Sequence, residues 1–147
     1  MFLVHGRDDG AKASVTLFLE RLGLEVIILH EQPNGGRTLM AKFIEEASAA
    51  AFAVVLMTAD DLGRLASDTK SHPSARARQN VVFELGFFIG LIGASRVCAL
   101  VAPGVERPSD FEAVAYVPFD AGATWKQELA RELRVAGLPI DHDALLR

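Results

Sequence analysis

The stretch Val81-Val-Phe-Glu-Leu-Gly-Phe-Phe-Ile-Gly-Leu-Ile-Gly-Ala-Ser-Arg-Val-Cys-Ala-Leu-Val101 decides the fold. From Val81 to Ile92 every residue except Glu84 is apolar or glycine, which is typical of a helix buried on most of its sides. Gly93 then ends the helix, and Val97–Val101 has the length and composition of a buried strand. A buried helix that leads directly into a buried strand indicates a parallel sheet covered by helices.

Strand-like and helix-like segments alternate along the rest of the chain in the same way. The expected strands are Phe2–Val4, Leu24–Leu29, Phe52–Met57, Val97–Val101 and Val114–Phe119, and the expected helices are Ala11–Leu22, Leu39–Ala50, Val81–Ile92 and Trp125–Ala136. This order predicts an α/β fold, a flavodoxin-like three-layer sandwich whose five-stranded parallel sheet has the order 2-1-3-4-5. The connections 58–79 and 102–113 are long for such a fold, and long loops are often functional or mobile.

The composition excludes several classes of protein. A chain of 147 residues that is 50% apolar and 23% charged suits one globular domain, so we expect a single domain over residues 1–147. A net charge of −4 lacks the basic excess of a general nucleic-acid coat protein. The single cysteine excludes an internal disulfide, the four histidines have no metal-ligand spacing, and no signal peptide or membrane span is apparent. We therefore expect a cytoplasmic protein without a metal, a membrane association or a nucleic-acid partner.

Glu84 is the residue that says most about function. A carboxylate surrounded by apolar residues must be paired, neutral or directed into a pocket. One interpretation is a structural glutamate that caps the helix or pairs with an arginine such as Arg78. The other is a carboxylate that faces a ligand, and the residues alone leave both open.

Three loops are expected at the point where the strand order reverses, which is the usual ligand site of such sheets. In the first, His5 to Asp9, Gly6 allows close backbone approach, Arg7 suits a phosphate, and Asp8 or Asp9 is able to cap the next helix. The second, His30 to Thr38, has a Pro-Asn-Gly-Gly turn, an exposed cation at Arg37 and Thr38 as a helix cap. The third begins with Thr58-Ala-Asp-Asp61 and continues into a basic stretch that ends at Arg78.

Three segments resemble the bacterial TIR-like domains, which have the Toll/interleukin receptor fold. They are Phe2-Leu-Val-His-Gly-Arg-Asp-Asp9, Ile28-Leu-His-Glu-Gln-Pro-Asn34 with Gly36-Arg-Thr38, and Ala77-Arg-Gln-Asn-Val-Val-Phe-Glu-Leu-Gly-Phe-Phe-Ile-Gly90. Members of that family were described as predicted nucleotide-binding proteins, and they occur in effectors of cyclic-nucleotide-triggered antiphage systems. Many of them cleave the nicotinamide–ribose bond of NAD.

The resemblance implies an NAD glycohydrolase that acts as an antiphage effector and is activated by self-assembly. NAD is its substrate, no cofactor is required, and a sensor domain for a cyclic nucleotide could belong to a longer natural protein. The implied catalytic residue is Glu84, with 30–38 as the mobile loop beside it. The implied substrate-binding residues are His5, Gly6, Arg7, Asp8, Arg37, Arg78, Asn80 and Phe83.

The chain departs from many active relatives at Asn80, where they carry a tryptophan. Phe83 or an aromatic side chain of another subunit could stack on nicotinamide instead, or Asn80 could bind a ribose hydroxyl. The alternative functions are a non-catalytic TIR-like binding or adaptor module and an enzyme similar to nucleoside deoxyribosyltransferases. A phosphoacceptor receiver domain fits poorly, because Met57-Thr-Ala59 provides no aspartate at the tip of its strand.

Overall fold

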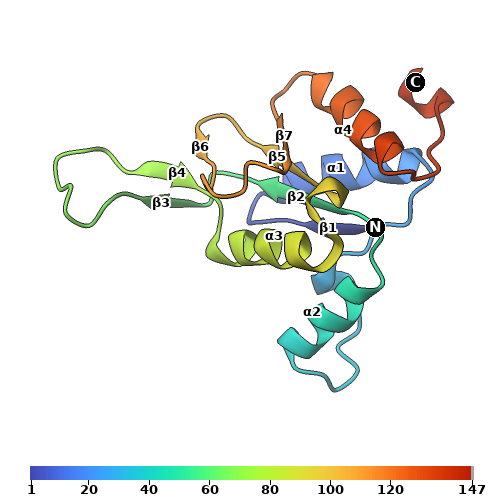
Figure 1. Ribbon diagram of the computed structural model, residues 1–147, viewed down its shortest axis with the longest axis horizontal. Helices are drawn as coiled ribbons and strands as arrows, with labels where there is room; N and C mark the ends of the chain where they lie inside the picture. The colour runs from blue at the N-terminus through green and yellow to red at the C-terminus, as the bar shows by residue number, and fades with distance from the viewer. Residues whose placement is uncertain (147) are drawn as a thin grey trace.

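A four-stranded parallel sheet forms the centre of the computed structural model, which describes residues 1–146 (Figure 1). Its strands are β1 (Phe2–Val4), β2 (Ala53–Met57), β5 (Val97–Val101) and β7 (Ala115–Pro118), in the spatial order β1-β2-β5-β7. Neighbouring strands pair in parallel, with Phe2 opposite Ala53 and Val54 opposite Cys98. Nearly all side chains of β1, β2 and β5 are buried, which agrees with the continuous apolar runs predicted for central strands, whereas in β7 only Val117 is buried.

Two helices cover each face of this sheet (Figure 1). The helices α2 (Leu39–Ser48) and α3 (Gln79–Ile92) share one core cluster, and α1 (Asp9–Arg21) and α4 (Thr124–Val135) share the other. Along β2, Ala53, Val55 and Met57 belong to the first cluster and the residues between them to the second, as the two-residue period of a strand requires. Short 3₁₀ turns complete the chain at Leu29–Glu31, Ala94–Arg96 and Asp143–Leu146.

The predicted helices agree with the observed ones to within about two residues at each end. Asp8 accepts a hydrogen bond from the amide of Ala11 and caps α1, and Thr38 caps α2 through the amide of Ala41. Gly93 follows α3 with a φ of 88°, in the left-handed region where glycine is favoured. No helix within residues 1–146 combines the length and apolar character needed to span a membrane.

The prediction of a fifth strand at Leu24–Leu29 was wrong. Only Ile27 bridges to β1: its amide donates to the carbonyl of Met1 (2.8 Å), and its carbonyl accepts from the amide of Leu3 (3.0 Å). The segment lies beside the outermost strand and turns into a 3₁₀ turn at Leu29, so a regular ladder does not develop. An apolar run predicts burial, but burial alone does not create enough pairing for a strand.

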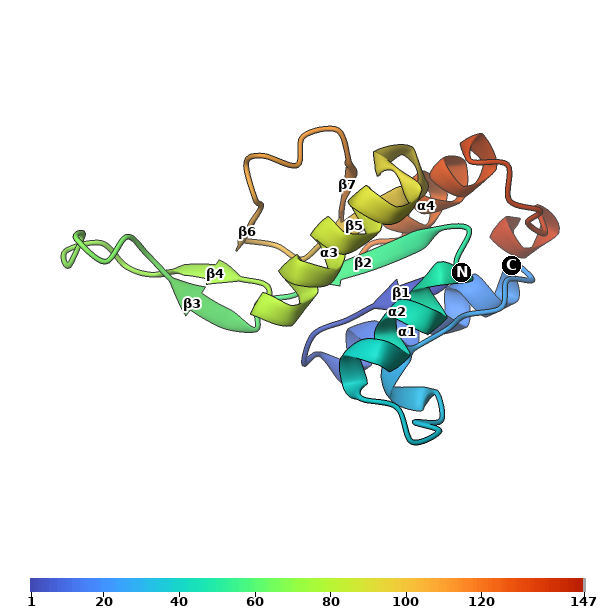
Figure 2. The same cartoon turned by 60° about the horizontal axis from the view of Figure 1, so that its bottom comes forward.

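The connection after β2 forms a projecting hairpin that the sequence did not predict (Figures 1 and 2). Its strands β3 (Asp61–Gly63) and β4 (Ser74–Arg76) pair antiparallel, and β4 also pairs in parallel with β6 (Val105–Glu106) from the connection after β5. These strands have two or three residues each, too short for a recognisable alternation of apolar and polar positions. Both long connections therefore carry a second, small sheet.

Candidate functional site

The candidate site lies where the carboxyl ends of β1 and β2 meet the beginning of α3. Asp60, three residues beyond β2, connects the segments there. Its Oδ1 accepts hydrogen bonds from the Arg7 amide (3.0 Å) and the Thr58 hydroxyl (2.8 Å), and its Oδ2 accepts one from the Arg78 amide (3.2 Å). The loop after β1 and the N-terminus of α3 are thus held by one carboxylate.

Gly6 lies directly against Asp60. A Cβ atom built on Gly6 would lie 1.9 Å from Asp60 Oδ2, so no larger residue fits there unless the aspartate moves. This face of Gly6, which the resemblance to TIR-like domains implied for substrate binding, is thus covered by a carboxylate of the chain itself. Arg7 is exposed, and its guanidinium donates to Asp61 (2.7 Å).

Glu84 lies in the second turn of α3, mostly buried, between the fully buried Val81 and Phe88. Burial raises the pKa of its carboxyl from 4.5 to about 7, and the positive charge of Arg78 opposes that rise. Within residues 1–146 Glu84 accepts no hydrogen bond and forms no ion pair. It is therefore not locked against an arginine, as the structural interpretation of this glutamate would require.

Arg78 and two histidines lie near one another beside this site. Arg78 is the residue before α3, and in the described chain its guanidinium has no hydrogen-bonding partner. The His5 ring, after β1, packs edge-on against that of His30 with centroids 5.8 Å apart. Partial desolvation lowers the pKa of His30, and His5, Lys42, Arg78 and Lys12 add to the effect. His5, which the resemblance implied as a substrate contact, thus shares the electrostatic environment of His30 and Arg78.

The loop 30–38 is tied to α2 by hydrogen bonds. Arg37 donates to the carbonyls of Pro33 (2.6 Å) and Asn34 (2.9 Å) and to the carboxylates of Glu45 (2.6 Å) and Glu46 (3.3 Å). The expectation of a freely exposed cation was wrong, because the Arg37 side chain is only 23% exposed and its donors are used within the loop and α2.

A buried lysine adds to these loop contacts. Lys42 is only 3% exposed and donates to Asn34 Oδ1 (2.9 Å). The loop is therefore pre-organised, although part of its sequence, Asn34-Gly-Gly, is typical of flexible turns.

Asn80 and Phe83 lie on the outer surface of the first turns of α3. Asn80 is exposed, and the Phe83 ring is 52% exposed. Phe83 packs on one side against Phe43 of α2 and Phe87, with ring centroids 6.3 Å apart in both pairs. Phe83 thus presents an aromatic ring to solvent one residue before Glu84.

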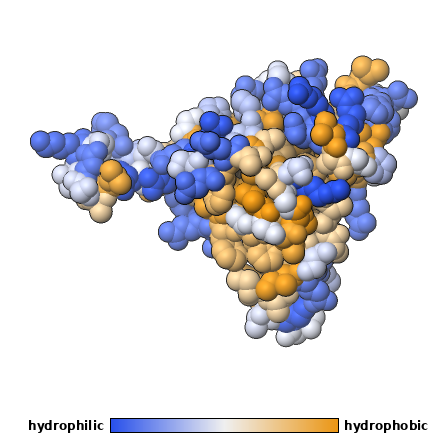
Figure 3. Space-filling model, in the orientation of Figure 1, coloured by the Kyte–Doolittle hydropathy of each residue, from blue (hydrophilic) through white to orange (hydrophobic). Residues whose placement is uncertain are grey.

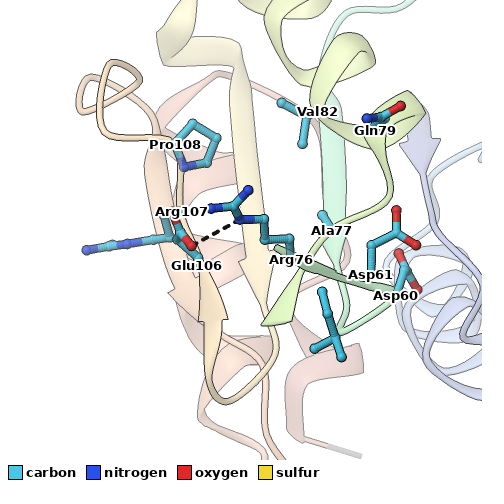
Figure 4. A pocket seen from close by; sticks show the side chains of 10 residues that line it. Asp60, Asp61, Arg76, Ala77, Gln79, Val82, Glu106, Arg107 and Pro108 are labelled. Atoms are coloured by element: carbon cyan, nitrogen blue, oxygen red, sulfur yellow. Dashed lines mark hydrogen bonds and ion pairs between the residues drawn. The ribbon is translucent and has the colours of Figure 1, made fainter. Parts of the chain in front are cut away.

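A separate open cavity of about 810 Å³ lies between the hairpin and α3 (Figure 4). Asp60 and Asp61 stand at one side of it and Glu106 and Arg107 at the other. Arg76 lies between them and donates to Glu106 (3.1 Å). Ala77 and Val82 supply an apolar wall, and Gln79 a polar group. Glu84 lines neither this cavity nor the smaller ones near Tyr116 and near Thr58.

The role of Asp60 was not predicted from the sequence. The loop Thr58–Asp61 was expected at the site, but none of its residues was expected to have a particular role. A carboxylate three residues after a buried strand is a weak signal by itself, and the contact with Arg7 joins residues 53 positions apart. Among residues 1–146 no group of three or more His, Cys, Asp or Glu side chains is arranged to hold a metal ion.

Comparison with known proteins adds independent information. The family model described as "CAP12/Pycsar effector protein, TIR domain" matches residues 1–121, a range that includes the loop after β1, the loop 30–38 and all of α3. The chain is 46% identical over 147 residues to the uncharacterized protein YuaY of Escherichia coli (strain K12), which covers 99% of this chain and 48% of the relative.

Two further relatives have informative names. Protein tirC of Dictyostelium discoideum is 34% identical over 127 residues, covering 81% of this chain and 63% of the relative. CD-NTase-associated protein 12 of Flavobacterium daejeonense is 31% identical over 77 residues, covering 52% of this chain and 24% of the relative. The chain thus spans about half the length of the first relative, 63% of the second and a quarter of the third.

Proposed function

The chain belongs to the CAP12/Pycsar effector family, because its residues 1–121 match the model of that family's TIR domain, and we propose that it cleaves the nicotinamide–ribose bond of NAD as an antiphage effector. One observation carries the proposal. Glu84 is a mostly buried carboxylate without a hydrogen-bonding or ionic partner in residues 1–146, and burial raises its pKa to about 7. Among residues 1–146 the Glu84 oxygens are not fully buried, so water reaches them, and a partly desolvated carboxyl group with a raised pKa is typical of a functional site.

One carboxylate is sufficient for this reaction. When the bond between the ribose C1′ and the nicotinamide nitrogen breaks, its electron pair neutralises the positive charge of the pyridinium ring, so the leaving group needs no proton. Positive charge develops on the ribose, and Glu84 would stabilise it or attack C1′ to form an ester. Water then supplies the hydroxyl at C1′ and releases one proton, giving ADP-ribose. Enzymes that hydrolyse O-glycosides need a second carboxyl group to protonate the leaving oxygen, whereas cleavage of NAD needs no such acid.

Arg78 is better suited than Arg7 to the substrate diphosphate. Its guanidinium is near enough to Glu84 and His30 to influence the pKa of both, and it is unpaired within the described chain. Arg7 already donates to Asp61 on an exposed surface. Guanidinium groups bind phosphates through paired hydrogen bonds, so a free one beside the proposed ribose site has a use in binding. His5, Asn80 and Phe83 would then contact the ribose and the nicotinamide.

Self-assembly would complete the site. Five exposed apolar side chains of α2 and α3 form a surface that we call the α2–α3 patch (Figure 3), and it consists of Leu39, Met40, Ile44, Phe83 and Leu91. Such contiguous apolar surface is typical of protein interfaces. Because Phe83 lies next to Glu84 and is 52% exposed, a second copy on this patch would cover the surface beside Glu84 and add side chains to the site.

The activating signal would come from outside this domain. The chain matches only part of each relative, and effector families of this kind respond to cyclic nucleotides, so we propose that a sensor domain of the longer protein drives the assembly.

The decisive experiment measures nicotinamide release from NAD against protein concentration, under crowding or with a fused assembly domain. The wild type is expected to show turnover that rises more steeply than protein concentration. Glu84→Ala is expected to fold and to release no nicotinamide, whereas Glu20→Ala, at an exposed position of α1, should behave as the wild type. Absence of turnover in the assembled wild type would refute the proposal.

A second candidate is a TIR-like module that binds nucleotide or a partner without turnover. The exposed Asn80, in the place of the tryptophan of many active relatives, favours it. Binding of NAD by the assembled protein without nicotinamide release would support this candidate. Base exchange between deoxynucleosides would instead indicate an enzyme similar to nucleoside deoxyribosyltransferases.

A further inference from the structure

Asp60 holds together the two segments between which the proposed site lies. Its carboxylate accepts from the amide of Arg7 in the loop after β1 and from the amide of Arg78 at the start of α3. The third donor, the hydroxyl of the buried Thr58, fixes the carboxylate relative to the end of β2. The amide of Asp60 also donates to the carbonyls of Thr58 and Arg76, so the residue is fixed from both sides.

Asp60 contacts the beginning of α3. Arg78 occupies the position before the first helical residue, and its side chain makes no capping hydrogen bond. Asp60 accepts from the amide of Arg78 itself, so its negative charge lies near the N-terminus of α3, where the positive end of the helix dipole favours it. Hydrogen bonds to an ionised acceptor are stronger than those between neutral groups.

Gly6 allows the carboxylate to reach its place. The built Cβ position on Gly6 lies within 3 Å of three atoms of the Asp60 side chain, so any side chain at residue 6 would displace Asp60. The close approach of Asp60 thus explains why residue 6 is a glycine, although the resemblance to TIR-like domains implied Gly6 as a substrate contact. Gly6 and Asp60 therefore act as one unit, although Asp60 lies far along the chain, 53 positions after Arg7.

We propose that Asp60 is a positioning residue, which sets the loop His5–Asp8 against the first turns of α3 so that Arg78 and Glu84 face the same ligand. This proposal rests on the proposed function. Asp60 itself does not touch the reacting atoms: its three donors occupy its carboxylate, and Glu84 is not among its partners. A displacement of about 1 Å between groups that must act together can reduce a rate about 100-fold.

Asp60→Asn is the sharpest variant because it keeps the size of the side chain. A single amide oxygen can still accept from the Arg7 amide and the Thr58 hydroxyl, but the NH₂ group then faces the N–H of Arg78, and two donors cannot bond. The variant therefore breaks the link to α3 selectively. Gly6→Ala displaces the same carboxylate from the opposite side. Asp110→Asn, at an exposed aspartate outside these contacts, is the matched control.

The test combines kinetics of NAD cleavage with NMR on the same variants. For Asp60→Asn and Gly6→Ala we expect kcat to fall about tenfold or more with KM changed less than about threefold. The amide resonances of Arg7 and Arg78 and the titration midpoint of the Glu84 carboxyl should move, whereas Asp110→Asn should change none of these. A kcat for Asp60→Asn within twofold of the wild type would overturn the proposal.

NMR separates this proposal from the proposed function. If the assembled wild type releases no nicotinamide, the proposed function fails, and the Glu84 titration alone decides the role of Asp60. An unchanged midpoint in both variants then overturns the positioning role, and a moved midpoint supports it. If Asp60→Asn does not stay folded at the assay temperature, Gly6→Ala carries the same comparison.

Discussion

Replacing Glu84 with glutamine should stabilise the domain at alkaline pH and have little effect at acidic pH. Burial raises the pKa of the Glu84 carboxyl from 4.5 to about 7, so the folded protein retains a proton there that the unfolded chain loses. The stabilising contribution of the protonated group is fully present below about pH 4.5. It is lost as the pH rises through about 7, because the buried group must then ionise. Glutamine is close in size and does not ionise.

The magnitude follows from the displaced pKa. A change from 4.5 to about 7, at about 1.4 kcal/mol per pKa unit, corresponds to about 3 kcal/mol of unfolding free energy between about pH 4 and pH 8. For a domain of this size that is a difference in melting temperature of roughly 10 °C. A residue that is needed for activity often lowers the stability of the folded protein, and the ionisable Glu84 is expected to do so.

Urea unfolding followed by tryptophan fluorescence provides the assay. Trp125 is the single tryptophan, is 3% exposed, and packs against Phe18 and Phe119 with centroids 5.2 and 5.1 Å apart. The unfolding free energy of Glu84→Gln minus that of the wild type should grow with pH. Glu20→Gln controls for removal of a surface carboxylate. A difference that is constant from about pH 4 to pH 8 would refute the reasoning, since Glu84 would then ionise equally in the folded and unfolded chain.

Other predictions concern activity, the loop 30–38 and the core. NAD cleavage should increase between about pH 6 and pH 8, because the carboxylate form of Glu84 is the active one, and a pH–rate profile without an inflection near 7 would contradict this role. Arg37→Ala should destabilise the domain by about 1 kcal/mol, because the loop loses four hydrogen bonds. Limited proteolysis within residues 30–38 should then be faster than in the wild type, and unchanged cleavage rates would argue against a pre-organised loop. Phe88→Ala should cost about 3–5 kcal/mol in chemical denaturation, because the ring is fully buried against Phe2, and a loss below about 1 kcal/mol would mean that the core collapses around the gap. Cys98 should react with thiol reagents only after unfolding, because burial raises its pKa to about 12; rapid labelling of the native protein would show that this strand opens.

The helices were predictable because their signals are local. Asp8, Thr38 and Gly93 mark helix boundaries through contacts with residues only a few positions away. The strands β1, β2 and β5 were predictable because they are buried on both faces and have continuous apolar runs, whereas β7 has only Val117 buried and its sequence signal is weaker. The strand predicted at Leu24–Leu29 was wrong because a segment beside the outermost strand is also apolar where it faces the core. Whether it pairs with β1 over several residues depends on the turn that follows, and here a 3₁₀ turn begins at Leu29.

The candidate site was only partly predictable. The burial of Glu84 could be expected from its apolar neighbours in the helix. In the structure most of the side chain is buried, and this burial raises the pKa of its carboxyl. The tethering of Arg37 could not be expected, because its partners Glu45 and Glu46 are acidic residues of a kind found on any exposed helix. The resemblance to TIR-like domains is confirmed by the family match over residues 1–121.

What the sequence determined by itself is the order of the four helices and the four strands of the central sheet, the family, and the presence of one carboxylate in an apolar helix. These properties depend on residues that are neighbours along the chain, where spacing and composition act directly on the backbone. Only the tertiary structure decided that Asp60 would link the Arg7 loop to α3 and fill the space above Gly6. Hydrogen bonds between distant segments depend on where the sheet places their ends, and no local pattern encodes that position.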